Sequence, residues 1–290
     1  MIYLTGSTGF VGNALLKYFG SDNFIEWKRG DEFRIDSASI VIHSAGKAHD
    51  FKKTSSPDEY YKINTELTQK VFDAFLASDA KVFITLSSVK AVADKVVGKL
   101  TENHQPNPIT HYGKSKLLAE QYIFSKVIPK GKRFYILRPC MIHGPGNKGN
   151  LNLLYKISSK GVPWPLGAYD NQRSFCSIDN LLFIINQLAI REDIPSGVYN
   201  VADDLTLSTN EIIALIAKSK DRNPRIWNVP KKIINSIAKL GDTFRFPLNT
   251  ERLEKLTQNY IVSNQKLVNA IGMKLPVNST LGMIKTINSF

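Results

Sequence analysis

The sequence predicts an α/β fold, a Rossmann-type doubly wound parallel sheet with a smaller α/β lobe at the C-terminal end. One observation is a short apolar strand, Ile2 to Leu4, that leads into a turn with three glycines and then into an apolar helical face. Another is that helical stretches separate three further apolar strands, at residues 40–42, 81–86 and 134–137. After Gly149 the composition changes, and we expect the lobe to begin there.

Length and composition are those of a soluble globular protein. The 290 residues are enough for one large core, or for one core and a smaller lobe. No apolar run approaches the roughly 20 residues that cross a bilayer, and the chain opens directly on a strand, so we expect a cytoplasmic protein without a transmembrane segment. Two cysteines are too few for a disulfide framework, and five scattered histidines predict no metal site.

The formal charge of +13 has several interpretations. The lysines are spread along the chain and no recognition motif for nucleic acid is present, so nucleic acid is not an expected partner. Attraction to polyanionic small molecules or to an acidic membrane surface fits the charge equally well. Solubility alone would also explain it.

The glycine turn has the spacing and the context of a dinucleotide-binding loop. Gly6 makes the tight turn, Gly9 lets the backbone approach a pyrophosphate, and Gly12 allows the helix to pack closely on the strand. We therefore expect cofactor contacts from Gly6, Thr8, Gly9, Phe10, Val11 and Gly12.

A tyrosine and a lysine four residues apart, Tyr112 and Lys116, lie on one face of a predicted helix. The ammonium of Lys116 would favour the phenolate of Tyr112 and lower a pKa that is about 10 in water. Such a tyrosine can exchange a proton with a substrate hydroxyl near neutral pH, and the hydroxyl of Ser88 can bind the same oxygen. Because this pair also occurs on many solvated helices, its weight comes from the motifs around it.

The GxxGxxG turn together with the YxxxK pair resembles the extended short-chain dehydrogenase/reductase superfamily, also called the NAD-dependent epimerase/dehydratase family. The resemblance extends over nearly the whole chain and implies NAD(P) binding, with Ser88, Tyr112 and Lys116 as catalytic residues. Members mostly act on nucleotide sugars, so the expected partner is a nucleoside-diphosphate sugar. The expected domains are residues 1–148 with about 175–202 for the cofactor, and 149–174 with 203–290 for the substrate.

The identity of the nicotinamide cofactor depends on the residues after the second predicted strand, Phe24 to Trp27. Lys28 and Arg29 follow it and favour NADP, because a base there accepts the 2′-phosphate. Glu26 stands 20 residues after Gly6, and a shift of register would make it the acid that binds NAD. NAD therefore stays open.

The resemblance implies further cofactor contacts beyond the glycine turn. Residues 33–36 look like a third strand whose Asp lies beside the adenine in the family. His43, inside an apolar run, is expected to be structural. The cofactor contacts implied by the resemblance, in addition to Tyr112 and Lys116, are Asp36, Ser44, Ala45, Gly46, Asn64, Ser87 and Pro139.

Three residues are expected on the substrate in addition to Ser88. The segment Ser88-Val89-Lys90 lacks the Thr-Asp-Glu of the family's dehydratases, which argues against a dehydratase. It is similar to the SSIK of a subgroup acting on N-acetylated 6-deoxy sugars, so Lys90 is either a substrate contact or a solvated loop lysine. Residues 163–175 are similar to the same subgroup and place Arg173 on the diphosphate, where a guanidinium can hold two oxygens. Asn150 matches a second diphosphate contact.

Two reactions share this machinery, hydride transfer at C4 of a hexose of the UDP-N-acetylhexosamine type. A 4-epimerase retains NAD, whereas a 4-ketoreductase uses exchangeable NADPH on a UDP-4-keto-6-deoxy-N-acetylhexosamine. An epimerase of a lipid-diphosphate sugar and a non-catalytic NADP-binding regulator are the alternatives. A homodimer is compatible with the resemblance.

Two helices of the lobe are also predicted. Ser208 with Glu211 forms a capping box at the start of one of them. Farther on, Ile233, Ile234, Ile237 and Leu240 make an apolar stripe on a basic helix. The stripe is interpreted as packing of the lobe, although a helix of this type can also lie on a membrane.

Overall fold

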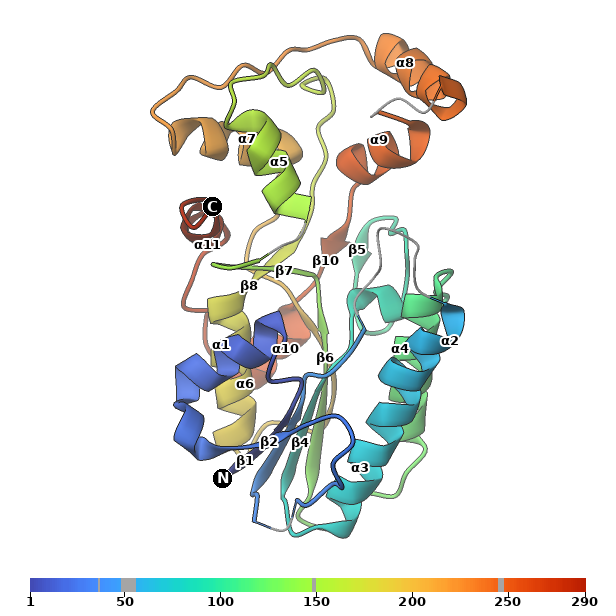
Figure 1. The fold of residues 1–290 in the computed structure, drawn as a ribbon, viewed down its shortest axis with the longest axis vertical. Coiled ribbons are helices and arrows are strands. Elements are labelled where there is room, and N and C mark those ends of the chain that lie inside the picture. The colour runs from blue at the N-terminus through green and yellow to red at the C-terminus, as the bar shows by residue number, and fades with distance from the viewer. Residues whose placement is uncertain (36, 48–55, 148–149, 245–247) are drawn as a thin grey trace.

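The computed structural model describes residues 1–35, 37–47, 56–147, 150–244 and 248–290, apart from the side chains at positions 150 and 153 (Figure 1). Six parallel strands form the main sheet in the order β2-β1-β3-β4-β6-β9. This arrangement confirms the predicted fold class. The strands are β1 (Ile2–Thr5), β2 (Phe24–Trp27), β3 (Ile40–His43), β4 (Val82–Leu86), β6 (Arg133–Pro139) and β9 (Gly197–Val201).

Helices cover both faces of this sheet (Figure 1). One apolar cluster joins Leu4, Ile42 and Ile84 to the helices α1 (Phe10–Phe19) and α6 (Ile178–Ile190). The alternate residues of the same strands, such as Val41 and Phe83, join a second cluster with the helices on the other face. Because both faces are buried, the strands read as continuous apolar runs. The helices of the second face are the short α2 (Pro57–Tyr60), a π-helical turn (Tyr61–Glu66), α3 (Leu67–Ala77) and α4 (His111–Phe124).

The lobe lies beyond the carboxyl ends of the strands and has two apolar clusters of its own. Two small parallel sheets connect it to the rest: β7 (Met141–His143) with β8 (Phe175–Ser177), and β5 (Lys99–Leu100) with β10 (Ile261–Val262). Its helices are α5 (Asn150–Ser158), α7 (Thr209–Lys218), α8 (Lys231–Phe244), α9 (Thr250–Thr257) and α11 (Ser279–Ile287).

The chain returns to the main sheet between the two parts of the lobe. Helix α6 packs on the sheet, and β9 is its last strand. Helix α10 (Gln265–Ile271) also contributes Leu267 and Ile271 to the apolar cluster that contains α1 and α6. We propose that the domains divide at the positions expected from the sequence, 1–148 with about 175–202 and 149–174 with 203–290, and that α10 of the second part packs back on the first.

The third strand predicted for residues 33–36 is wrong for the part that the structure describes. Residues 33–35 form no strand, and β1 is followed in the sheet directly by β3. The chain bends here instead, because Asp31 N donates to Lys28 O and Arg34 N donates to Glu32 O. Phe33 stacks on Trp27 with ring centroids 5.3 Å apart, so its apolar surface is used in a loop. Asp36 lies outside the described residues.

Candidate functional site

The glycine turn joins β1 to α1 at the carboxyl edge of the sheet. Gly6 has a φ of +80°, and a Cβ there would stand 2.5 Å from the backbone nitrogen of Ala45. A Cβ on Gly12 would stand 2.1 Å from the carbonyl oxygen of Gly6. Both positions therefore require glycine, since the turn is pressed between the loop after β3 and the helix.

The first turn of α1 presents backbone N–H groups that no side chain caps. Gly9 is the N-cap residue, no acidic residue lies in the first turn, and Thr8 beside it is exposed. Phe10 and Val11 begin the helix and are partly buried. Uncapped N–H groups at a helix N-terminus bind anions such as phosphate. The turn fits the pyrophosphate of a dinucleotide.

The loop after β3 is tied to helix α4 through Asn64. Its amide oxygen accepts a hydrogen bond from Lys47 N at 2.8 Å, and its amide nitrogen donates to Ser115 Oγ at 3.0 Å. Ser44 donates to the carbonyl of Thr5 at 2.7 Å and so fixes the loop to β1. A Cβ on Gly46 would stand 3.0 Å from Nζ of Lys116. The small side chains after β3 therefore leave room for this ammonium.

Tyr112 and Ser88 meet where β4 ends beside the first turn of α4. The hydrogen bond between them lowers the pKa of Tyr112, but burial raises that pKa by more, so it stands above its ordinary value. Tyr60 contributes a further rise, with its ring 6.4 Å from that of Tyr112 in an edge contact. A Cβ on Gly113 would stand 2.4 Å from the carbonyl oxygen of Lys90, so α4 lies directly on the turn after Ser88.

Lys116 lies on the same helix with 6% of its surface exposed. Its Nζ donates to the carbonyl oxygen of Leu86 at 2.8 Å. Burial lowers the pKa of Lys116 to about 8, although the negative charge of Glu120 acts to raise it. The sequence-based expectation that Lys116 lowers the pKa of Tyr112 is wrong for this structure, because burial outweighs the favourable contacts and raises that pKa.

A buried ion pair beneath these residues was missed by sequence reasoning. Arg138 Nε donates to Glu120 Oε1 at 3.0 Å, and Ser87 donates to the same carboxylate. Both charged side chains are at most 5% exposed. Glu120 lies four residues after Lys116 on the same helical face, and this spacing is the signal that could have drawn attention to it. The pair holds Ser87, one of the expected cofactor contacts, between α4 and β6.

Two of the expected substrate residues, Lys90 and Arg173, come from different parts of the fold and meet around Tyr260. Lys90 Nζ lies 4.3 Å from the ring centroid of Tyr260 and donates to Asp94 O at 2.8 Å. Burial lowers the pKa of Lys90 to about 8; the charge of Asp94 opposes this, and that of Arg173 adds to it. Arg173 donates to the carbonyl of Lys255 on α9. Lys90 is therefore half-buried rather than solvated.

The remaining expected contacts stand at the edges of the site. Lys28 and Arg29 are exposed in the turn that follows β2. Pro139 is the last residue of β6 and is paired in register with Val201 of β9. Helix α5 begins at Asn150, whose side chain lies outside the described part.

His43 is buried between two hydroxyl groups. Its ring nitrogens lie 2.6 Å from Thr5 Oγ1 and 2.9 Å from Thr68 Oγ1. Burial, with a contribution from Lys116, lowers the pKa of His43 to about 3. The ring is thus neutral at physiological pH, in keeping with the predicted structural role. Within the described ranges, no group of three or more histidine, cysteine or acidic side chains could hold a metal ion.

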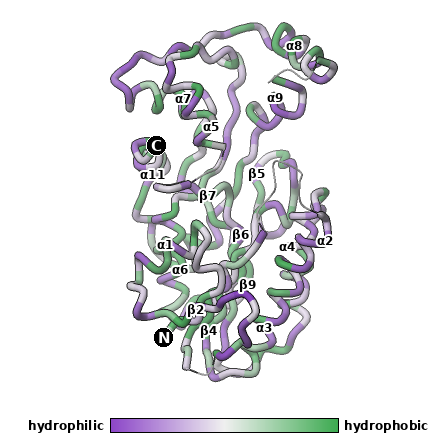
Figure 2. The backbone as a smooth tube through the Cα atoms, in the orientation of Figure 1, coloured by the Kyte–Doolittle hydropathy of each residue, from purple (hydrophilic) through white to green (hydrophobic). Residues whose placement is uncertain are grey.

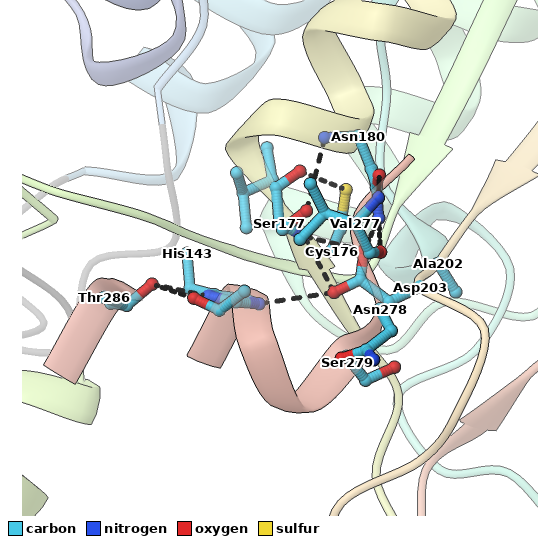
Figure 3. Close-up of polar contacts among 12 residues, drawn as sticks. His143, Cys176, Ser177, Asn180, Ala202, Asp203, Val277, Asn278, Ser279 and Thr286 are labelled. Atoms are coloured by element: carbon cyan, nitrogen blue, oxygen red, sulfur yellow. Dashed lines mark hydrogen bonds and ion pairs between the residues drawn. The ribbon is translucent and has the colours of Figure 1, made fainter. Parts of the chain in front are cut away.

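A second buried network, drawn in Figure 3, joins the sheet to the lobe. His143, the last residue of β7, lies 2.8 Å from Thr286 Oγ1 and 3.4 Å from Asp203 Oδ2. Asp203 also accepts hydrogen bonds from Ser177 N at 2.9 Å and from Asn180 Nδ2 at 2.7 Å. The network fixes α11 against the start of α6, on the side of the site opposite α4 (Figure 1).

Comparison with known proteins gives a family and several relatives. The model of the NAD dependent epimerase/dehydratase family matches residues 28–202. The UDP-glucose 4-epimerase of Vibrio cholerae is 28% identical over 319 aligned positions, which cover 100% of this chain and 95% of the relative. The N-acetyl-α-D-glucosaminyl-diphospho-ditrans,octacis-undecaprenol 4-epimerase of Escherichia coli O157:H7 is 28% identical over 253 positions, 79% of this chain and 75% of the relative.

Solved structures share the fold over almost the whole chain. The UDP-N-acetylglucosamine 4-epimerase from Bacillus cereus superposes with a TM-score of 0.75 at 18% identity, and the match covers 99% of this chain and 97% of the other. The two-part architecture described above, with sheet and lobe together, is thus that of a known enzyme.

Proposed function

Because the chain belongs to the NAD dependent epimerase/dehydratase family, we propose that it is an NAD(P)-dependent 4-epimerase of a nucleoside-diphosphate hexose, of the UDP-N-acetylhexosamine type. The observation that carries the proposal is the hydrogen-bonded pair Tyr112 and Ser88, placed over buried Lys116 at the carboxyl edge of the sheet. Both relatives named above are 4-epimerases, which favours epimerisation over one-way reduction. The non-catalytic alternative is disfavoured because Tyr112 and Lys116 are both present.

In this proposal Tyr112 exchanges a proton with the oxygen on C4 of the sugar, and Ser88 donates a hydrogen bond to the same oxygen. The glycine turn, Gly46 and Lys116 hold the dinucleotide. The bound nicotinamide would supply a hydride acceptor and donor for C4. Arg173, Lys90 and Asn150 bind the diphosphate end of the substrate, where two cations at the same place favour an anion.

The central test is the substitution Tyr112→Phe, assayed on UDP-glucose and UDP-N-acetylglucosamine. Removing the hydroxyl removes the proton donor and acceptor, so turnover should fall by about 10²–10⁴-fold while the fold is retained. Tyr122→Phe is the matched control, because Tyr122 lies on the same helix and donates at 2.6 Å to exposed Asp73. Wild-type turnover by the Tyr112→Phe protein would remove the basis of the proposal.

Identification of the nucleotide released on denaturation separates epimerase from ketoreductase. A retained equivalent of NAD would support the epimerase, since the cofactor is regenerated in every cycle. A protein that binds NADPH and releases it freely would instead support reduction of a 4-keto sugar. Lys28 and Arg29 slightly favour NADP, and Lys28→Glu with Arg29→Ser should shift the binding preference toward NAD.

A lipid-diphosphate sugar is the second candidate substrate. It is supported by the undecaprenol-linked relative, which is as similar in sequence as the UDP-glucose enzyme over the part that it matches. Assays of the UDP-linked and the lipid-linked N-acetylglucosamine, side by side, distinguish the two. We further propose that the enzyme works in the cytoplasm as a homodimer, which light scattering after size exclusion would test.

A further inference from the structure

Helix α8 is attached to the lobe by one narrow face. Ile234 and Ala238 are buried in the apolar cluster that contains Trp164 and Leu253. Gly241, one turn farther along the helix, is also buried, and a Cβ there would stand 2.0 Å from the carbonyl oxygen of Leu248. These residues recur every three to four positions and account for the packing of the helix on α9 and its neighbours.

A second apolar stripe on α8 points to solvent. Ile233, Ile237 and Leu240 follow each other at spacings of four and three and are 51%, 43% and 54% exposed. They share a helical face, adjacent to the buried face but distinct from it. Figure 2 shows hydrophobic and hydrophilic residues alternating along this helix. Three large aliphatic side chains aligned on the surface mark an interaction site more often than scattered ones do.

The segment that contains this stripe is strongly basic. Residues 218–244 contain seven lysines and arginines and two aspartates, and one of these, Asp242, accepts a hydrogen bond from Thr250 N. Between the ends of α5 and α7, a hollow of about 500 Å³ has four cationic side chains in its lining, Lys160, Lys220, Arg222 and Arg225. The loop that carries the last three runs with α8 along the end of the molecule farthest from the main sheet (Figure 1). We call residues 218–244 the lobe tip.

The lobe tip lies one helix away from the candidate substrate site. Helix α8 packs on α9, and the carbonyl of Lys255 on α9 accepts a hydrogen bond from Arg173. Only α9 therefore lies between α8 and Arg173, so a surface bound by the lobe tip would be close to the candidate substrate site.

We propose that the lobe tip docks on an anionic membrane surface. Ile233, Ile237 and Leu240 enter the boundary between headgroups and acyl chains, while the lysines and arginines of the lobe tip contact lipid phosphates. A second copy of this chain is a poorer occupant, because it would bring two faces of the same positive charge together. The proposal goes beyond the proposed reaction and does not depend on it.

Sedimentation with vesicles tests the docking on the full-length protein. Wild type should bind vesicles of phosphatidylcholine with phosphatidylglycerol and should not bind phosphatidylcholine alone. Ile237→Asp with Leu240→Asp should weaken the binding by at least about tenfold, because two aliphatic side chains no longer enter the lipid. Since the stripe lies outside the core of the lobe, the melting temperature and the turnover of soluble UDP-sugar should stay at wild-type values.

Two control variants separate the stripe from charge and from general effects. Val127→Asp with Ile190→Asp changes the charge equally at exposed apolar residues of the main domain, and binding should persist. Arg225→Gln with Lys232→Gln should weaken binding at low salt, whereas Lys17→Gln with Lys130→Gln should weaken it less.

Three results would overturn the proposal. They are a wild-type protein that stays in the supernatant with anionic vesicles, a stripe variant that binds like wild type, and a stripe variant that changes only a dimer into a monomer. The last result would assign the stripe to a second copy. Because the readout is binding to vesicles without substrate, failure here would leave the proposed epimerase activity standing.

Discussion

Lys116 carries its charge at a place where burial opposes it. With a pKa of about 8 in the folded protein and 10.5 as the ordinary value, the ammonium destabilises the fold at neutral pH. Lys116→Met should therefore raise the free energy of unfolding at pH 7 by about 1–3 kcal/mol while abolishing turnover. The gain should be full below pH 8 and should vanish as the pH rises toward 10.5.

Denaturant titrations of both proteins between pH 6 and pH 10 would measure this gain. Lys114→Met is the matched control, because Lys114 is exposed on the same helix. A Lys116→Met protein that is less stable than wild type at pH 7 would show that the bond to Leu86 outweighs the cost of burying the charge.

The buried His43 should make the stability of the protein depend on pH in the acid range. Its pKa is about 3 when folded and 6.5 ordinarily, so the unfolded chain binds a proton that the folded one refuses. This linkage should cost wild type roughly 3–5 kcal/mol as the pH falls from 6.5 to 3. His43→Gln should be less stable at pH 7 but should lose less stability over that range. His104→Gln, at an exposed histidine, should keep the wild-type acid profile in thermal melts.

At the scale of elements, two glycines of the same turn should have different roles, Gly12 in stability and Gly9 in cofactor binding. Gly12→Ala forces a methyl group against the carbonyl of Gly6, so it should destabilise the protein by about 1–3 kcal/mol. At Gly9 the nearest atom to a Cβ, the carbonyl oxygen of Gly6, is 3.3 Å away, so Gly9→Ala should lower the melting temperature less than Gly12→Ala. It should nevertheless weaken dinucleotide binding by about tenfold, because the methyl group would stand where we propose that the pyrophosphate approaches.

Binding of NAD and NADPH, measured by calorimetry, and the melting temperature of each variant test this separation. The two glycines would have the same role if Gly12→Ala and Gly9→Ala lost stability and affinity in equal proportion.

Elements with a local signal could be predicted from the sequence. The Ser208 box forms both of its hydrogen bonds at the start of α7, where the spacing of Ser208 and Glu211 predicts a helix start. The predicted strand at residues 33–36 failed because its apolar residues fill a loop: Phe33 stacks on Trp27 and Ile35 is buried. Apolar pattern alone does not distinguish a strand from a buried loop.

The sequence predicts which residues lie close together at the candidate site better than it predicts their pKa values. The spacing of Tyr112 and Lys116 pointed to one helical face, and the structure places both beside the end of β4. The direction of the pKa of Tyr112 depends on burial by residues distant in sequence, which no local pattern contains. The contact of Arg138 with Glu120 and the approach of Lys90 to Arg173 are likewise long-range.

At the scale of the whole molecule, contacts on two sides of the candidate site join the main sheet to the lobe. Lys90 packs on Tyr260 near α9, and His143 reaches Thr286 of α11. Among the described helices none is long and apolar enough to cross a membrane. The docking proposed above places the lobe tip on the surface of a bilayer. The enzyme would then face lipid with its lobe and keep its main sheet away from the surface.

The order of the strands has a consequence for synthesis on the ribosome. The sheet receives its last strand, β9, only when residue 201 has been made, and the first segment of the lobe, with α5, is made before that strand. That segment waits for α7 and α11 before its apolar residues are covered. A nascent chain stalled before residue 209 thus lacks α7 and α11, which cover the apolar residues of α5 in the finished protein.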